Sequence, residues 1–455
     1  MVKDLTRGKP IKLIVSFCLP LMLGQLFQQL YNMVDSIIVG RFAGTAELSA
    51  VGSTGAISFL IIGFVTGFET GLAIPISQAF GERNETKLRK LFANAVFLSA
   101  AGSAVLTAAM FFLTPSVLRV MNTPDEIFDM AYDYIGTVFL GLTVTFFYNL
   151  FAGVMRALGD SRTPLILLIF SSLFNIVLDL YFVTVLKMAC KGVAIATVIA
   201  QAISAVAALI IIIFKFRILH FSKEEARISG KLCSRLLAIS LPMALQISVT
   251  AIGSIMLQSA VNTLGSNAIA AVTVASKIQL MLILPSEQIG VAMATYCGQN
   301  IGAKRLDRIK QGIKNAVMLD LGYCVVSISV AFFLGGYLAS LFVPPGQTEV
   351  IAMVARFLRT CCIFYPILAV LFTLRNSIQG LGYSLPAMAA GLFELLARAV
   401  MSFAVIPRYG YAAVCIANPS AWIAADIFLI PVFFTVYHIL SKRYGKTDNN
   451  KAAAD

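Results

Sequence analysis

The feature that most constrains this sequence is a series of apolar runs, each roughly 20 residues or longer, separated by short polar segments. Hydrophobic residues make up 59% of the 455 residues and charged residues only 13%. A helix of about 20 apolar residues can cross a bilayer, whereas a soluble domain of this size needs more polar surface. The sequence predicts an all-α polytopic membrane protein. We expect twelve transmembrane helices, near residues 13–38, 52–79, 91–113, 127–153, 164–186, 192–214, 236–262, 270–298, 314–338, 350–374, 386–406 and 411–438.

The basic residues gather in the segments between these runs. The net charge of +13 could suggest a nucleic-acid partner, but the positive-inside rule explains this distribution with fewer assumptions. It predicts that both termini are cytoplasmic and that the chain lies in the cell (inner) membrane. No nucleic acid and no obligate protein partner is expected. The lipid bilayer and small molecules are the expected partners.

The two halves of the chain repeat each other. Leu19-Pro20 corresponds to Leu241-Pro242, and Gln78-Ala-Phe-Gly81 corresponds to Gln299-Asn-Ile-Gly302, at offsets of 222 and 221 residues. Leu158-Gly159 likewise pairs with Leu381-Gly382. Six spans in each repeat give both copies one orientation, related by a pseudo-two-fold axis along the membrane normal. Such parallel repeats are typical of secondary carriers.

The longest polar connection divides the repeats. We therefore expect an N-lobe at 1–214, a cytoplasmic linker at 215–235, a C-lobe at 236–440 and a cytoplasmic tail at 441–455.

Asp35 is the first candidate functional residue, because it lies deep inside the first apolar run. An aspartate at the centre of a membrane helix costs about 2.5–3.5 kcal/mol on insertion scales, so it is rare unless it faces a bundle interior, a water-filled path or a cation.

Span 5 carries a second acid with a polar neighbour. Asn175 and Asp179 are four residues apart, so they share one helix face. At about 1.5 Å per residue, Asp35, Asp179 and Thr197 of span 6 all lie roughly 21–22 Å from the inner end of their helices. Their oxygen atoms suit Na⁺, and two facing carboxylates equally suit a shared proton. The alternative for Asn175 and Thr197 is hydrogen bonding to neighbouring helices alone.

Taken together, these motifs resemble the MATE (multidrug and toxic compound extrusion) transporters. The resemblance rests on the two six-helix lobes, the paired Leu-Pro and Q-x-x-G motifs, Arg156-Ala-Leu-Gly-Asp160 and Asp35, and it covers about residues 10–440. It implies export of organic, often cationic compounds driven by inward flow of Na⁺ or H⁺. It also implies that Asp35, Asn175, Asp179 and Thr197 form the first-lobe cation site of the bacterial DinF-like branch. Where that branch often has another Asn in span 4, this chain has Ala152, with Asn149 one turn earlier.

The second half does not repeat this chemistry. Arg398 falls within one residue of the repeat equivalent of Asn175, and residues 241–261 contain no acid. A fixed positive charge argues against a second cation site there. Glu394, one turn before Arg398, is expected to pair with it, and Arg375 lies near the inner end of span 10.

Other acids and aromatic residues supply candidates for a substrate cavity. Glu287 follows Pro285, whose ring breaks the helix ladder and can expose backbone carbonyls to a cavity. Glu69 and Asp426 are further acids within spans 2 and 12, and Glu69 has the alternative of pairing with a nearby Lys or Arg. Packing is the alternative for the remaining cavity candidates, which are Tyr31, Phe27, Tyr148, Met256 and Gln279.

The sequence thus predicts a cation-coupled antiporter that exports hydrophobic, cationic compounds by alternating access. A flippase for a lipid-linked or amphipathic metabolite is the alternative. An enzyme is not expected, because no H-E-x-x-H, G-x-S-x-G or P-loop motif is present. No cofactor is expected beyond the coupling ion, Na⁺ or H⁺, and the scattered cysteines suggest packing, not a zinc site or disulfides.

Overall fold

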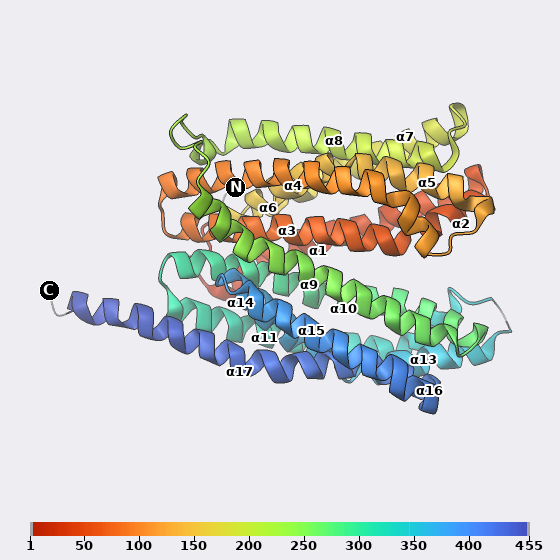
Figure 1. Ribbon diagram of the computed structural model, residues 1–455. Coiled ribbons are helices and arrows are strands. Elements are labelled where there is room, and N and C mark those ends of the chain that lie inside the picture. The colour runs from red at the N-terminus through yellow and green to blue at the C-terminus, as the bar shows by residue number, and fades with distance from the viewer. Residues whose placement is uncertain (1–2, 345, 453–455) are drawn as a thin grey trace. The chain divides into compact units, whose positions relative to one another are not determined.

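The computed structural model describes residues 3–344 and 346–452, and these residues are almost entirely helical (Figure 1). By residue contacts the chain divides into two compact units, residues 1–4 with 19–244 and residues 5–18 with 245–455. Helix α1 (Pro10–Ile38) begins in the second unit and continues in the first, and α9 (Gly230–Asn262) begins in the first and continues in the second. The predicted lobe, linker and tail boundaries remain predictions.

Among the described residues, the first unit contains the longer part of α1, seven complete α-helices and the first part of α9. Short π-helical or 3₁₀ turns follow three of the helices: η1 (Val39–Ala43) follows α1, η2 (Tyr181–Val185) follows α7, and η3 (Arg217–Leu219) follows α8. The helices are α2 (Thr45–Ser53), α3 (Gly55–Gly81), α4 (Glu85–Val120), α5 (Asp125–Leu140), α6 (Leu142–Ala157), α7 (Arg162–Leu180) and α8 (Ala189–Lys215).

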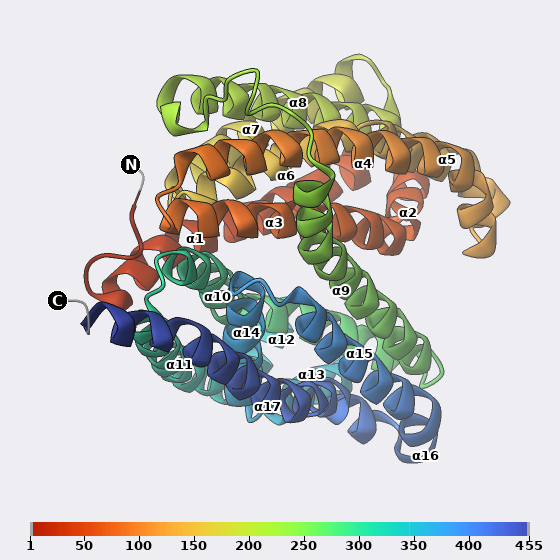
Figure 2. The same cartoon turned by 60° about the vertical axis from the view of Figure 1, so that its left-hand side comes forward.

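The core of this unit lies where α3, α4 and α6 run side by side (Figure 2). Leu72, Leu91 and Leu150 from these three helices are fully buried. On α3, Gly67 and Gly71 are one turn apart. A Cβ atom at either position would lie within 3 Å of the α9 backbone, at Met243 and Ser240 respectively. Small residues therefore allow α3 and the first part of α9 to pack closely.

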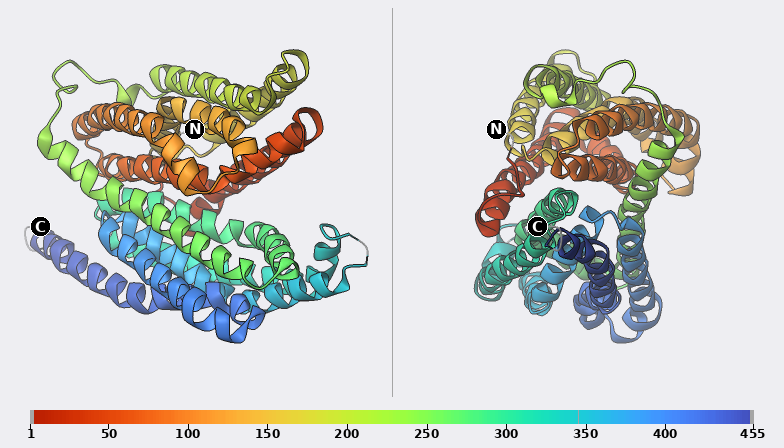
Figure 3. Two further views of the ribbon diagram at one scale, coloured as in Figure 1. Left: turned by 45° about the vertical axis from the view of Figure 1, so that its right-hand side comes forward. Right: turned by 90° about the vertical axis from the view of Figure 1, so that its left-hand side faces the viewer.

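The second unit contains the rest of α9 and eight further α-helices, of which α15 and α17 run alongside each other, as do α10 and α14 (Figure 3). Two π-helical turns, η4 (Val330–Leu334) and η5 (Met401–Val405), interrupt it. The helices are α10 (Ser266–Gly302), α11 (Leu306–Ser329), α12 (Gly335–Ser340), α13 (Thr348–Cys362), α14 (Tyr365–Gly380), α15 (Ser384–Val400), α16 (Ile406–Tyr409) and α17 (Tyr411–Ala452).

The predicted membrane fold is confirmed. Ten helices of the described residues are long and apolar enough to span a membrane, or up to twelve if each of two bent helix pairs is one span. The bent pairs, α5 with α6 (46°) and α13 with α14 (54°), fall on the predicted spans 127–153 and 350–374. The first bends at Gly141, where a Cβ would lie 2.4 Å from Val198, and the second bends where α14 begins at Tyr365, with Pro366 in its first turn.

Candidate functional site

The carboxamide of Asn175 lies between two carboxyl groups in the first unit. With its nitrogen turned toward the acids, Asn175 Nδ2 donates to Asp35 Oδ1 at 3.3 Å and to Asp179 Oδ2 at 3.1 Å. Its oxygen accepts from the Thr197 backbone N–H at 3.2 Å. This orientation is the one that gives both ends of the amide a partner. The four predicted coupling residues are thus brought together from α1, α7 and α8.

Two further relationships complete this cluster. The carboxyl groups of Asp35 and Asp179 both contact the one amide nitrogen of Asn175, so they lie close to each other. The Tyr31 hydroxyl and Thr197 Oγ1 are 3.3 Å apart, and Tyr31 lies one turn before Asp35 on α1. The structure therefore places Tyr31, predicted to lie in the substrate cavity, beside the acids.

Both acids lie just before a π-helical turn. Asp35 is four residues before η1, and Asp179 is two residues before η2. Single π-helical turns often occur at functional sites, because the widened turn disturbs the regular backbone hydrogen bonding. Asp179 and Asn175 are 0% and 1% exposed, whereas Asp35 and Thr197 are half-buried. Asp179 Oδ1 has no hydrogen-bond partner within the described residues.

This arrangement can hold either of the two cations expected from the sequence, H⁺ or Na⁺. Two carboxyl groups in a poorly solvated place can share one proton, because two negative charges at this distance repel strongly. Na⁺ would find carboxylate and hydroxyl oxygens here, but it would have to rotate the Asn175 amide, whose oxygen is already engaged by Thr197.

The other predicted cavity residues take no part in the hydrogen bonds of this cluster among the described residues, although Phe27 lies one turn before Tyr31 on α1. Glu69 is 0% exposed, and its carboxylate accepts from Ser99 Oγ at 2.8 and 2.9 Å, so its partner is a hydroxyl and not a Lys or Arg. Glu287 is half-buried, with no hydrogen bond or ion pair among the described residues. Phe27 is exposed, Tyr148 and Met256 are half-buried, and Gln279 is buried. The roles of these residues remain predictions.

In the second unit Glu394 contacts two arginines. The expected contact with Arg398 is present, with Nη2 3.5 Å from Glu394 Oε2. The closer partner is Arg375, whose Nη2 donates to Glu394 Oε1. The sequence interpretation missed this because Arg375 lies on α14, and spacing along α15 reports only neighbours in the same helix.

The sequence interpretation also passed over Asp320. This residue of α11 is 0% exposed, and its Oδ1 accepts from Ser286 Oγ at 2.5 Å. The signal was available, because Asp320 is a carboxylate inside the predicted span 314–338, the same feature that singled out Asp35. Asn149, the possible extra ligand, donates only to the Thr145 carbonyl of its own helix in the described structure.

Comparison with known proteins identifies relatives along the whole chain. A family model described as MatE matches residues 20–181 and 242–404. The probable multidrug resistance protein YpnP of Bacillus subtilis (strain 168) is 27% identical over 449 residues, 97% of this chain and 97% of that protein. The probable multidrug resistance protein NorM of Thermotoga maritima is 24% identical over 405 residues, 88% of this chain and 86% of that protein.

The fold also resembles solved structures. One is the outward-facing conformation of a multidrug resistance MATE family transporter of the MOP superfamily. The TM-score is 0.88 at 22% sequence identity, over 96% of this chain and 98% of that chain. A likeness at this identity establishes the fold of the chain.

Proposed function

Because the chain belongs to the MatE family, we propose that it is a secondary transporter that extrudes hydrophobic, cationic organic compounds in exchange for an inward flow of H⁺. The protein lies in the cell membrane with both termini in the cytoplasm and alternates between inward- and outward-open states. The relatives named as multidrug resistance proteins support the substrate class.

The observation that carries this proposal is the pair of acids around Asn175. An acid costs free energy inside a membrane, and two acids at one place cost more, unless a cation or proton is bound there in part of the cycle. Binding of a proton from outside neutralises the pair and allows it to close around Asn175. Release of that proton to the inside restores the repulsion between Asp35 and Asp179 and completes the coupling step.

The orientation of Asn175 favours H⁺ as the coupling ion. Its N–H groups face the carboxyl oxygens, and its own oxygen is held by Thr197, so the amide acts as a donor to the acids. A proton shared by the two acids keeps this hydrogen bonding intact. Na⁺ would need the amide oxygen and would face the N–H groups instead.

The position of α1 offers a way to transmit this change. Asp35 sits four residues before the π-helical turn η1, which contacts α8, the helix that carries Thr197. Protonation removes a charge at the end of the regular part of α1, so the turn can tighten or open at low cost. In this mechanism the repositioned α1 weakens the hold on substrate in the outward-open state.

Glu287 supports a cationic substrate. It is a half-buried acid on α10 without a hydrogen-bond or ion-pair partner in the described part of the chain. Such an acid within a membrane helix is available to a cationic ligand.

Extrusion from liposomes tests the function. Purified protein is reconstituted with an ethidium-type dye and given either a pH gradient or a Na⁺ gradient. We expect the pH gradient alone to drive dye movement. Dye movement driven only by the Na⁺ gradient would identify Na⁺ as the coupling ion. If neither gradient moves the dye, this result contradicts multidrug extrusion and favours a lipid-linked flippase.

A further inference from the structure

Four ionisable side chains of the second unit form a buried cluster that the first-unit site does not use. They are Arg375 of α14, Glu394 and Arg398 of α15, and Asp426 of α17. Their exposed fractions are 6%, 3%, 6% and 6%. Buried charges are stable only when each is paired and hydrogen bonded, so the pairing within the cluster decides its state.

The two arginines share one carboxylate. Arg375 donates to Glu394 Oε1, and Arg398 Nη2 lies at the longer distance of 3.5 Å from Glu394 Oε2. The guanidinium of Arg398 is held against α9 at Gly253, where a Cβ atom would lie 3.2 Å from Arg398 Nη1. A bulkier residue at 253 would displace Arg398.

Several polar atoms of the cluster are left unpaired. Within the described residues, Arg375 Nε, Arg398 Nε, Arg398 Nη1 and Asp426 Oδ1 are buried without a hydrogen-bond partner. Two guanidinium groups thus compete for Glu394, whereas no ion pair of the described residues joins either of them to Asp426, although α17 packs against both α14 and α15. An ionised Asp426 in this position would leave a buried charge unpaired, which is costly. A protonated Asp426 carries no charge and avoids this cost.

A second arrangement of the same side chains pairs every charge. If Arg375 turns to Asp426, Glu394 is left entirely to Arg398, one turn away on the same helix. Each arginine then has its own carboxylate. The observed arrangement suits a neutral Asp426, and the alternative suits an ionised one.

The titratable groups of the described residues that lie near this part of α17 come from two helices. Helix α14 contributes Arg375 and, beside Trp422, the hydroxyl of Tyr365, and α15 contributes Glu394 and Arg398. On α13 the nearest titratable groups, Arg356 and Cys361, lie against Cys415, about 16 Å further along α17 at 1.5 Å per residue. In α16 and η5 the only charged residue is Arg408, close to the start of α17.

We propose that Asp426 is a proton-binding site of the second unit, and that its proton decides whether Arg375 pairs with Glu394 or with Asp426. A proton taken up from water neutralises Asp426 and leaves Glu394 as the partner of both arginines. Release of the proton to water restores the Asp426 carboxylate. The Arg375 side chain then turns from Glu394 on α15 to Asp426 on α17. The site is separate from Asp35 and Asp179 and does not depend on the proposed function.

The tryptophan fluorescence of the chain can report this change of arginine pairing. Trp422 is the single tryptophan of the sequence and lies one turn before Asp426 on α17. Its indole is 5% exposed, and its ring centroid is 6.3 Å from that of Tyr365 on α14. A change of charge and of arginine pairing one turn away will alter its emission.

The test is a pH titration of tryptophan fluorescence on the full-length protein in lipid nanodiscs, between about pH 4 and pH 10, where buried carboxyl groups titrate. We expect one sigmoidal transition in the wild type. Asp426→Asn should remove it and hold the emission at the acid-side value, because Asn mimics the neutral acid. Asp35→Asn should leave the midpoint unchanged, which separates this site from the first-unit site.

A flat wild-type titration, or an Asp426→Asn protein that keeps the transition, would overturn the proposal. Arg375→Gln gives an independent reading if Asp426→Asn fails to elute as a folded monodisperse protein. Without the neighbouring cation, proton binding at Asp426 is favoured, so the midpoint should move to higher pH by about one unit or more. An unchanged midpoint in Arg375→Gln would equally overturn it.

Discussion

Asp35 of α1 and Asp179 of α7 lie on either side of one carboxamide, whose nitrogen is 3.3 Å from the first carboxyl group and 3.1 Å from the second. The two acids are 144 positions apart in the sequence (179 − 35). Asn175 holds them together because it is on the same helix face as Asp179, one turn earlier. The position of both acids therefore depends on a single amide.

Replacing that amide should uncouple transport. Asn175→Leu keeps the approximate volume but removes the donor shared by the two acids, so we expect at least a tenfold loss of gradient-driven dye extrusion, which corresponds to about 1.4 kcal/mol. Asn149→Leu is the matched control, because the Asn149 amide donates only to Thr145 in its own helix. Equal extrusion by both variants would contradict a bridging role.

The turn between α6 and α7 is held by Asp160. Its Oδ1 accepts from the backbone N–H groups of Arg162 and Thr163, at 3.1 and 3.0 Å, and its Oδ2 accepts from Lys215 Nζ at 2.9 Å. Burial alone would raise the pKa of Asp160, but the Lys215 and Thr163 hydrogen bonds outweigh it and hold the pKa below its usual range. Asp160 thus caps α7 and ties it to the end of α8.

The sign of this shift gives a pH prediction. A carboxyl group with a lowered pKa stabilises the folded state above its unfolded pKa, about pH 4, and this contribution is lost as pH falls through the folded pKa. Asp160→Asn keeps the cap but removes the charge. We expect a loss on the order of 1 kcal/mol at pH 7, because Lys215 is 43% exposed and partly screened.

Thermal unfolding in detergent measures that loss. The difference in melting temperature between wild type and Asp160→Asn should shrink as the pH is lowered toward about pH 3. Asp133→Asn is the control, since its ion pair with Lys191 is about half exposed on both sides, 49% and 47%. A pH-independent difference for Asp160→Asn would argue against the charge as its cause.

A glycine in the second unit allows α10 and α14 to approach. A Cβ atom at Gly380 would lie 2.3 Å from the Ala294 carbonyl oxygen, a backbone atom that cannot move aside alone. Gly380→Ala should therefore destabilise the protein by about 1–3 kcal/mol. Gly336→Ala is the matched change in α12, where nothing lies within 4 Å, and it should be neutral or slightly stabilising. Melting temperatures of the two variants that do not differ would contradict this packing.

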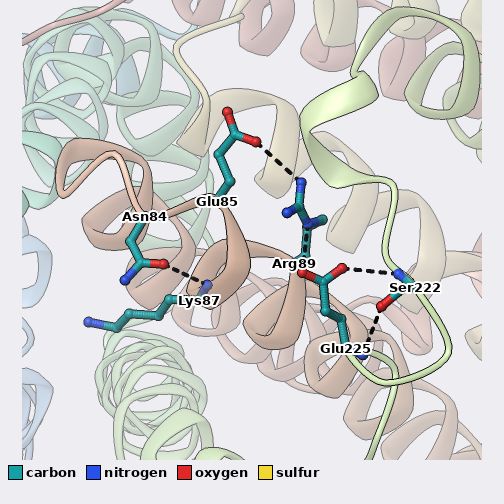
Figure 4. Close-up of polar contacts among 6 residues, drawn as sticks. All are labelled: Asn84, Glu85, Lys87, Arg89, Ser222 and Glu225. Atoms are coloured by element: carbon teal, nitrogen blue, oxygen red, sulfur yellow. Dashed lines mark hydrogen bonds and ion pairs between the residues drawn. The ribbon is translucent and has the colours of Figure 1, made fainter.

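The connection between α8 and α9 is fastened to α4 by one acid (Figure 4). Glu225 Oε1 accepts from Arg89 Nε at 3.0 Å, Glu225 Oε2 accepts from the Ser222 backbone N–H at 3.0 Å, and Arg89 also donates to Glu85 at 3.2 Å. Glu225→Gln removes the ion pair with Arg89.

We expect this change to loosen the connection without affecting transport. Trypsin should cleave Glu225→Gln after Lys223 and Arg227 about two- to fivefold faster than wild type, because loss of the Arg89 contact lets the connection open more often. Glu224→Gln, a change at the exposed neighbour, is the control. Equal cleavage rates in the two variants would show that the Arg89 contact does not restrain the connection.

Much of the fold could be predicted because the sequence patterns that indicate it extend over many residues. Twenty-residue apolar runs and the repeated Leu-Pro and Q-x-x-G motifs indicate a helical membrane protein with two related halves. The bend at Gly141 could not be predicted, because it depends on the contact with Val198, which is distant in the sequence. The exchange of the first parts of α1 and α9 between the units likewise has no local signal.

Residues of the candidate site could be predicted where the residue itself is costly to place in a membrane helix. Asp35 and Asp179 were identified because a carboxylate in an apolar run requires a partner. Tyr31 was assigned to a cavity, since nothing in its own helix reports Thr197 on α8. No partner of Arg375 was predicted from the sequence for the same reason, because Glu394 contacts it from another helix.

Coupling is tested most directly by measuring proton influx and dye efflux in the same liposomes, for wild type and Asp35→Asn. We expect wild-type dye efflux to be accompanied by proton influx, and we expect Asp35→Asn to lose both under an imposed pH gradient. If Asp35→Asn still moves protons in exchange for dye, the acids around Asn175 are not the coupling site.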